Sequence, residues 1–131
     1  VIDEEAHVAH VLAAPLPATV GDAVAGAVDA ARRLDHRQQH TGQHLLSALA
    51  ADRFGWETAS VHFGDRLSTI DFATERAAHD ALLELEAAAN AAVAENRPVT
   101  VGFEEAATAA GLRKPSGRTG TIRIVTIDGL D

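Results

Sequence analysis

Two histidines, His40 and His44, stand four residues apart in the run His-Thr-Gly-Gln-His. In a helix this spacing places both imidazoles on one face, about 40° apart around the axis. Two imidazoles in that arrangement are able to share one metal ion or one polar group of a substrate. His36 lies one turn earlier on the same face, so spacing alone groups three histidines.

The pair supplies only two of the four ligands that a zinc ion normally takes. The chain has 7 histidines, so one such pair is unsurprising, and it has no cysteine that would add a thiolate ligand. A zinc-protease motif is disfavoured because Thr41 follows His40, where that mechanism needs a glutamate. Spacing therefore leaves three interpretations open: half of a metal site, a core feature, or an accident of composition.

Length and composition narrow the setting. The 131 residues suit one domain, and the missing initiator methionine suggests a processed or excised piece. We expect a cytoplasmic protein without a membrane partner, because no stretch resembles a membrane span and the acidic start does not resemble a signal peptide. The net charge of −8 argues against a broadly basic nucleic-acid surface. Two basic clusters are either local phosphate contacts or solvated surface charges: Arg32, Arg33 and Arg37, and Arg113, Lys114, Arg118 and Arg123.

The histidines need a helix, and the sequence predicts one from the N-cap Asp29 to about residue 53. Its apolar stripe includes Leu34, Leu45 and Leu49, and the histidines lie beside that stripe, where a cleft is able to form. A second helix is predicted from the cap residue Thr74 to residue 96, and a short one over 104–110. Strands are predicted at 7–12, 58–63, 67–72, 99–103 and 121–127, and 23–28 suits strand or helix.

These elements predict an α+β fold. An antiparallel sheet built from residues 58–72, 99–103 and 121–127 is expected to pack against the two long helices. The segments near 8–12 and 23–28 are expected to be the remnant of an N-terminal β-barrel or to extend from the core. In the strand at 58–63, Thr58, Ser60 and His62 are expected to share one face, which lines a pocket or faces solvent.

Longer segments resemble a known family. The run from Arg32 to Ala48 closely resembles the signature helix of the alanyl-tRNA editing family. That family comprises the editing domain of alanyl-tRNA synthetase, the free-standing AlaX-type proteins and the related editing domain of threonyl-tRNA synthetase. Further segments agree in order and spacing, so that the resemblance spans nearly the whole chain: residues 21–29, 58–64, 69–72, 111–115 and 122–125.

The resemblance implies a zinc ion held by His40 and His44 and by a Cys-x-x-x-His pair after the strand at 122–127. That second pair is expected beyond Asp131, so we expect the chain alone to bind substoichiometric zinc. His36 is no longer a ligand on this interpretation. The resemblance divides the chain into residues 1–28, the last part of a β-barrel subdomain, and residues 29–131, an editing domain without its final Cys-x-x-x-His segment.

The implied activity is hydrolysis of the ester of tRNA(Ala) mischarged with serine or glycine, in a pocket that acts as a second sieve. Ser60 and His62 fall on the strand that lines the family's pocket, and are candidate catalytic residues. The partner is the acceptor end of tRNA(Ala), and five residues are candidates for contacts to its phosphates: Arg32, Arg33, Arg113, Lys114 and Arg118.

Two alternatives remain open at this point. The first is a non-catalytic remnant of the editing scaffold that serves as a binding or assembly module. The second is an unrelated metal-dependent hydrolase that uses His40, His44 and a carboxylate such as Asp71.

Overall fold

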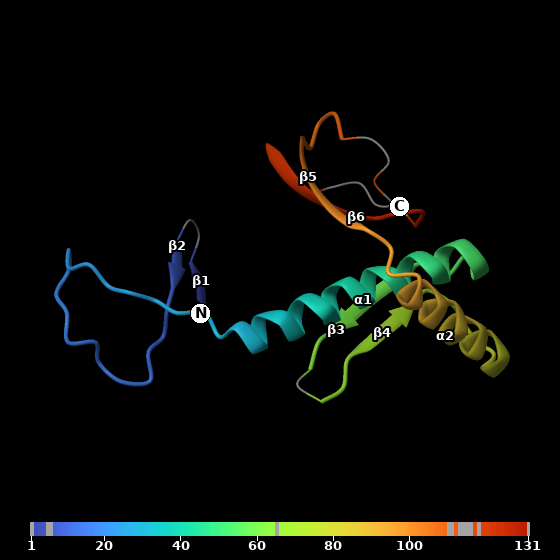
Figure 1. The fold of residues 1–131 in the computed structure, drawn as a ribbon, viewed down its shortest axis with the longest axis horizontal. Coiled ribbons are helices and arrows are strands. Elements are labelled where there is room, and N and C mark those ends of the chain that lie inside the picture. Colours follow the sequence, from blue (N-terminus) through green and yellow to red (C-terminus); the bar gives the residue numbers. More distant parts are fainter. Residues whose placement is uncertain are drawn as a thin grey trace. The chain divides into compact units, whose positions relative to one another are not determined.

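The computed structural model describes residues 2–4, 7–64, 66–109, 112, 117 and 119–130, and the side chains from residue 9 onward. Within them, the strands pair as antiparallel two-stranded sheets, β1–β2, β3–β4 and β5–β6. The fold is α+β, as the sequence predicts (Figure 1). The elements are α1 (Ala30–Phe54), α2 (His79–Ala94), β1 (Ile2–Glu4), β2 (His7–Ala9), β3 (Thr58–His62), β4 (Thr69–Phe72), β5 (Val99–Glu105) and β6 (Thr121–Ile127).

The chain divides into two compact units, Val1–Ala30 and Ala31–Asp131. The first unit contains the β1–β2 hairpin and a tight turn in which Gly21 has a φ of 103°. In that turn the Asp22 carboxylate accepts hydrogen bonds from the backbone N–H of Thr19 at 2.8 Å and from its hydroxyl at 2.9 Å. These bonds lower the pKa of Asp22, the backbone bond most.

The predicted strands of this first unit are largely wrong. β2 ends at Ala9 rather than at residue 12, and residues 23–28 form neither a strand nor a helix. Val24 and Val28 are 65% and 77% exposed, so this segment buries little apolar surface. An extended segment without a neighbouring strand has no ladder to pair its backbone groups. The described residues of the unit therefore show no remnant of a β-barrel.

α1 organises the second unit. Its observed bounds lie within a residue of the predicted ones. The helix ends before Gly55, whose φ of 67° favours glycine, and the N–H groups of Gly55 and Trp56 donate to the carbonyls of Ala51 and Ala50 at 2.9 and 3.2 Å. Leu34, expected on the buried stripe, is 53% exposed. Burial is confined to the C-terminal half of the helix.

The hydrophobic core gathers around that half of α1. Phe54 and Trp56 have ring centroids 4.7 Å apart, and Trp56 and Phe72 5.9 Å apart, which extends the core toward the β3–β4 hairpin. Arg53 on α1 pairs with Glu84 on α2 at 3.0 Å. The buried cluster takes side chains from both helices, from β6 and from the turn after it: Leu45, Ala48, Leu49, Ala50, Leu85, Ala92, Ile127 and Leu130.

The β3–β4 hairpin carries an irregularity that the sequence did not predict. Thr58 pairs with Phe72 and Ser60 with Asp71, so Ala59 is an extra residue in β3. The extra residue turns Thr58 to the other face, where its hydroxyl contacts Ser47 of α1. The expectation that Thr58 shares a face with Ser60 and His62 is therefore wrong, because a bulge shifts the alternation.

The single predicted sheet is also wrong, since β3–β4 and β5–β6 form separate hairpins. Alternation in a sequence predicts strands, but it does not determine which non-consecutive strands pair. The β5–β6 register runs from Val99 opposite Ile127 to Glu105 opposite Thr121. β5 thus continues to Glu105 and a turn follows, where a short helix was expected over 104–110; residues 110 and 111 lie outside the described residues.

α2 begins four residues later than predicted. Ala78 precedes it with an extended backbone, φ −68° and ψ 144°, and without a side-chain cap. Thr74, the expected cap, donates its hydroxyl hydrogen to the carbonyl of Arg76 at 3.3 Å and so closes a local turn. Leu85 is the large buried residue of the helix. The rest of its packing surface consists of Ala88, Ala89 and Ala92.

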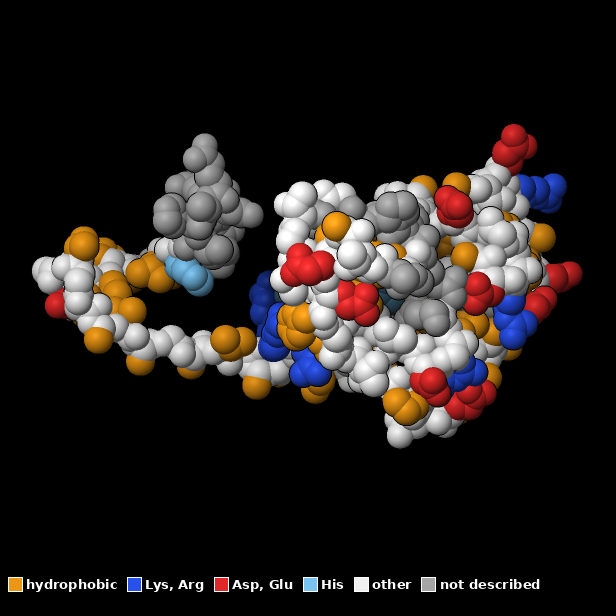
Figure 2. All heavy atoms as spheres, turned by 90° about the horizontal axis from the view of Figure 1, so that it is seen from above, with side chains coloured by type: hydrophobic (Ala, Val, Ile, Leu, Met, Phe, Trp, Pro, Cys, Tyr) orange, Lys and Arg blue, Asp and Glu red, His pale blue; other side chains and the backbone are white. Residues whose placement is uncertain are grey.

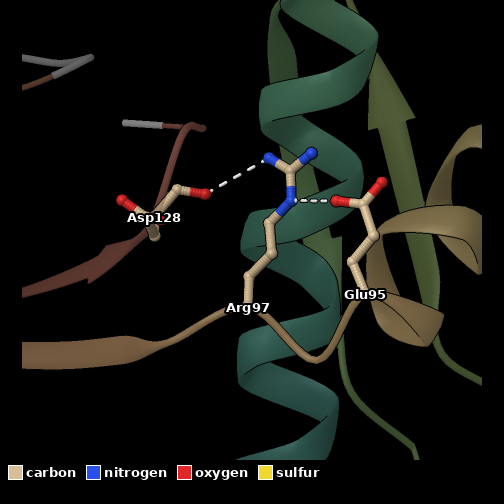
Figure 3. Close-up of polar contacts among 3 residues, drawn as sticks. All are labelled: Glu95, Arg97 and Asp128. Atoms are coloured by element: carbon tan, nitrogen blue, oxygen red, sulfur yellow. Dashed lines mark hydrogen bonds and ion pairs between the residues drawn. The ribbon is translucent and has the colours of Figure 1, made fainter.

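Arg97 connects the end of α2 to the end of β6 (Figure 3). Its Nε lies 2.6 Å from Glu95 Oε2, and its Nη1 donates to the carbonyl of Asp128 at 3.2 Å. These contacts hold the turn after β6 against the α2–β5 connection. Among the described residues, no helix has both the length and the apolar character needed to cross a membrane.

Candidate active site

His40 and His44 lie side by side on the exposed half of α1. Their ring centroids are 4.6 Å apart, with the ring planes at 73°, and both side chains are exposed. Successive turns of the helix put the two imidazoles within reach of one small ion or group. Imidazole nitrogen is a ligand that zinc accepts, so the pair fits half of a zinc site.

A groove begins beside this pair. It has a volume of about 1200 Å³, and its walls come from α1, from the end of α2 and from the β5–β6 hairpin. His36 and His40 line it, together with Phe63 and Gly64 from the connection that follows β3. Its apolar lining includes side chains of four elements: Leu34, Leu45, Val93, Val99, Val101, Val125 and Ile127. The sequence prediction of a cleft beside the histidines is consistent with this groove.

The groove is rich in arginine although the chain carries a net charge of −8. Figure 2 shows Lys and Arg side chains gathered at the end of the second unit where α1 begins. Acidic and basic side chains are mixed at the opposite end. The lining arginines are Arg32, Arg33, Arg37, Arg97 and Arg123. Such a concentration of one charge attracts an anionic ligand.

The predicted phosphate-binding residues divide into two groups. Arg32 and Arg33 line the groove, as a phosphate contact there requires. Arg113, Lys114 and Arg118 lie outside the described residues.

Polar side chains hold the hairpin against the histidine-bearing helix. Thr58 Oγ1 donates to Ser47 Oγ at 2.7 Å, and Gln43 Nε2 donates to the same oxygen at 2.9 Å. Toward the start of the helix, Ser68 Oγ donates to Gln39 Oε1 at 3.0 Å. Gln39 and Gln43 were missed by the sequence analysis, although each directly precedes one of the two histidines.

Ser60 and His62 occupy a different position from the groove. They pair with Asp71 and Thr69 across the hairpin and are exposed on the face opposite the one that contacts α1. The Ser60 hydroxyl donates a very short hydrogen bond to the Asp71 carboxylate. Neither residue lines the groove. Their catalytic role stays a prediction.

No third ligand joins the histidine pair within the part of the chain that the structure describes. There, no three His, Cys, Asp or Glu side chains group closely enough to hold a metal ion. Asp71, the carboxylate of the alternative metal-dependent hydrolase, is accordingly not brought to His40 and His44.

Gly64 fixes the path of the chain beside the groove. A Cβ atom at this position would lie 2.5 Å from the carbonyl oxygen of Leu67, far inside contact distance. Only glycine therefore allows the β3–β4 connection to turn so tightly. This turn sets the position of Phe63, whose ring centroid is 6.2 Å from that of His40.

Comparison with known proteins gives a consistent set of relatives. The chain is 35% identical over 120 residues to the alanyl-tRNA editing protein Aarsd1 of Bos taurus. This match covers 88% of this chain and 27% of that protein. It is 36% identical over 128 residues to Aarsd1-A of Xenopus laevis, and this match covers 93% of this chain and 30% of that protein. It is 32% identical over 88 residues to AlaX-M of Methanosarcina acetivorans, and this match covers 67% of this chain and 36% of that protein. No family model matches the chain. The chain thus spans about a third, or less, of the length of these curated relatives.

Proposed function

This chain belongs to the family of alanyl-tRNA editing proteins, and we propose on that premise that it hydrolyses the ester of serine or glycine mischarged onto tRNA(Ala). Water adds to the ester carbonyl carbon, the bond to the ribose oxygen breaks, and that oxygen takes a proton. The observation that carries the proposal is the exposed His40–His44 pair at the edge of an arginine-lined groove. A separate hydrolytic pocket is the expected solution where a synthetic site discriminates poorly between small amino acids.

His40 and His44 are the residues that would hold a zinc ion in this proposal. Zinc supplies a Lewis acid that polarises a bound oxygen and lowers the pKa of bound water. Two imidazoles leave two positions of a four-coordinate site for other ligands. We place those ligands in a Cys-x-x-x-His segment after Asp131 of a longer protein, as the family resemblance implies.

The remaining roles follow from chemistry and position. Arg32 and Arg33 are proposed to contact phosphates of the tRNA acceptor end, as are Arg113, Lys114 and Arg118. Ser60 and His62 are proposed to act as polar catalytic groups from the β3–β4 hairpin. The proposed domain division keeps residues 29–131 as the editing domain, with residues 1–28 as a separate N-terminal segment. The proposed setting is the cytoplasm, where tRNA is charged.

The test is deacylation of Ser-tRNA(Ala). The protein is compared with a His40→Ala/His44→Ala variant and with a His36→Ala variant as the matched control on the same exposed helix. Loss of a group that only supports a metal ligand costs about 10- to 100-fold in activity, so the double variant should lose at least about 100-fold. The control should keep its rate. Equal and measurable deacylation by all three proteins would show that the histidine pair has no part in hydrolysis, and no deacylation by the unsubstituted protein would contradict the proposed activity of this chain.

One observation favours a second function. Within the described residues the histidine pair has no third ligand close by, which suits a non-catalytic module that binds RNA on the editing scaffold. The same assay separates the two functions, because such a module would bind Ser-tRNA(Ala) and leave its ester intact.

A further inference from the structure

One edge of β5 is open. Within the described residues, β5 pairs with β6 alone. At one end of this ladder the N–H of Ala106 donates to the carbonyl of Gly120 at 2.9 Å, and at the other end the N–H of Asp128 donates to the carbonyl of Pro98 at 3.1 Å. Backbone groups alternate between the two sides of a strand, so the even-numbered residues of β5 point toward β6. Three odd-numbered residues direct their N–H and C=O groups to the open edge: Val99, Val101 and Phe103.

This edge lacks the features that usually prevent a strand from pairing with another chain. The stretch Val99–Phe103 is described throughout, and it contains no charged residue, no proline and no bulge. The side chains of Val99, Val101 and Phe103 lie on one face of the strand and are 48%, 49% and 69% exposed. In the other hairpin of the unit, by contrast, β3 is interrupted by the bulge at Ala59. A two-stranded hairpin with an apolar face gains stability when further strands are added.

The open edge of β5 is complementary to a second copy of itself. When two β5 strands run antiparallel about a two-fold axis at Val101, the backbone N–H and C=O of Val101 bond to those of the same residue in the second copy. Val99 then lies opposite Phe103 of the second copy, and pairs of an aromatic and a β-branched side chain stabilise antiparallel sheets. Glu105 lies opposite Arg97 of the second copy, so opposite charges meet at both ends of the contact.

Neighbouring registers pair these side chains less well. A shift of two residues in one direction places Glu105 opposite Val99, and a shift of two in the other direction separates Phe103 from Val99. The register centred on Val101 also aligns the apolar side chains of both hairpins. Because Val125 pairs with Val101 within one hairpin, the central row across the four strands consists of valine alone.

We propose that two copies of this chain associate through β5. They form one antiparallel four-stranded sheet in the order β6–β5–β5–β6, with the two-fold axis at Val101. The contact supplies partners for the open backbone groups of both copies and covers part of the exposed apolar face. This inference goes beyond the proposed function and does not depend on it.

The first test follows the molecular mass of the chain over a dilution series by sedimentation equilibrium. The unsubstituted chain should change from the mass of one chain to that of two as its concentration rises. Val101→Pro should weaken dimerisation about 30-fold, because it removes both hydrogen bonds of the central pair. A proline is tolerated in an edge strand where the N–H points away from the neighbouring strand, so the variant should keep its fold by circular dichroism.

Val11→Pro is the matched control. Val11 is 71% exposed and lies outside the helices and strands. This variant should form dimers as readily as the unsubstituted chain.

The second test uses the absence of cysteine from the chain. In Val101→Cys the two thiols lie on directly opposite residues, whose Cα atoms are about 5.5 Å apart in a hydrogen-bonded pair, within the range of a disulfide. Mild oxidation should therefore join two chains. Val99→Cys is the control, because its two copies are offset by four residues, about 14 Å along the strands, and should stay unlinked. Gel electrophoresis without reductant measures both, and it decides the question if Val101→Pro does not fold.

Four results would overturn the inference. These are a chain that stays monomeric at every concentration, a folded Val101→Pro variant that dimerises normally, equal cross-linking of Val99→Cys and Val101→Cys, and a mass that grows beyond two chains. Growth beyond two chains would assign the edge to open-ended association. A monomer in which the amide protons of Val99, Val101 and Phe103 exchange slowly would assign it to another segment of the same chain.

Discussion

Between Leu45 and Ala50, α1 buries four side chains in the core, whereas over residues 30–38 all its side chains are exposed. The backbone geometry is the same, but the composition differs. The buried half is Leu and Ala, and the exposed half is rich in Arg, His and Gln. Packing in the core explains the composition of the buried half and leaves that of the exposed half unexplained. Side chains that no packing contact requires are available to a ligand, and here they are of the types that bind metals and phosphates.

The largest expected difference in the free energy of unfolding is between a Leu→Ala substitution in the buried half of α1 and one in its exposed half. Leu49→Ala removes a buried side chain and should lower the free energy of unfolding by about 2–5 kcal/mol. Leu34→Ala, its matched control, should change it by less than about 0.5 kcal/mol, because Leu34 is mostly exposed. Urea unfolding followed by circular dichroism measures both. An equal loss in the two variants would contradict the division of the helix.

Gly64→Ala in the β3–β4 connection and Gly42→Ala in α1 compare a tight turn with an open position on the helix. The new methyl group at residue 64 meets the Leu67 carbonyl and should cost about 1–3 kcal/mol. At residue 42 nothing lies within 4 Å of the added atom, and replacing glycine inside a helix should stabilise the protein by about 0.5–1 kcal/mol. Unfolding shifts of the same sign would show that the β3–β4 connection does not turn so tightly at residue 64.

Ser47 lies within the buried half of α1, where it contacts the β3–β4 hairpin, and its loss should have a smaller effect. Ser47→Ala removes the acceptor for Thr58 and Gln43 and should cost about 0.5–2 kcal/mol. Ser60→Ala on the outer face is the control, with an expected change of less than about 0.5 kcal/mol. If Ser60→Ala proved the more costly variant in the same unfolding experiment, the bulge in β3 would be wrongly placed.

The sequence predicted the features that depend on local patterns, and it did not predict those that depend on long-range contacts. Periodicity and end signals located α1 within a residue and β6 at its observed bounds. The bulge at Ala59 and the separation of the two hairpins depend on which strands and side chains meet. Alternation does not carry that information. Val24 and Val28 have strand-forming side chains without a partner strand, so propensity gave the wrong answer there.

The residues of the candidate site also divide into those that the sequence predicted and those that only the folded chain brings together. Spacing alone grouped His36 with His40 and His44, and only the resemblance of the whole segment separated them. Gln39 and Gln43 were missed because their roles depend on Ser68 and Ser47, which approach them only in the folded chain. The groove likewise combines residues far apart in sequence, such as Arg37 and Arg123.

The most direct test is the effect of zinc on the urea unfolding midpoint of three proteins. Without zinc, the unsubstituted chain, His36→Ala and His40→Ala/His44→Ala should unfold within about 0.5 kcal/mol of one another, since all three histidines are exposed. Zinc at ten times its dissociation constant should stabilise the first two by about 1.4 kcal/mol and leave the double variant unchanged. An equal zinc-induced shift in all three proteins would contradict the assignment of the exposed half of α1 to metal binding.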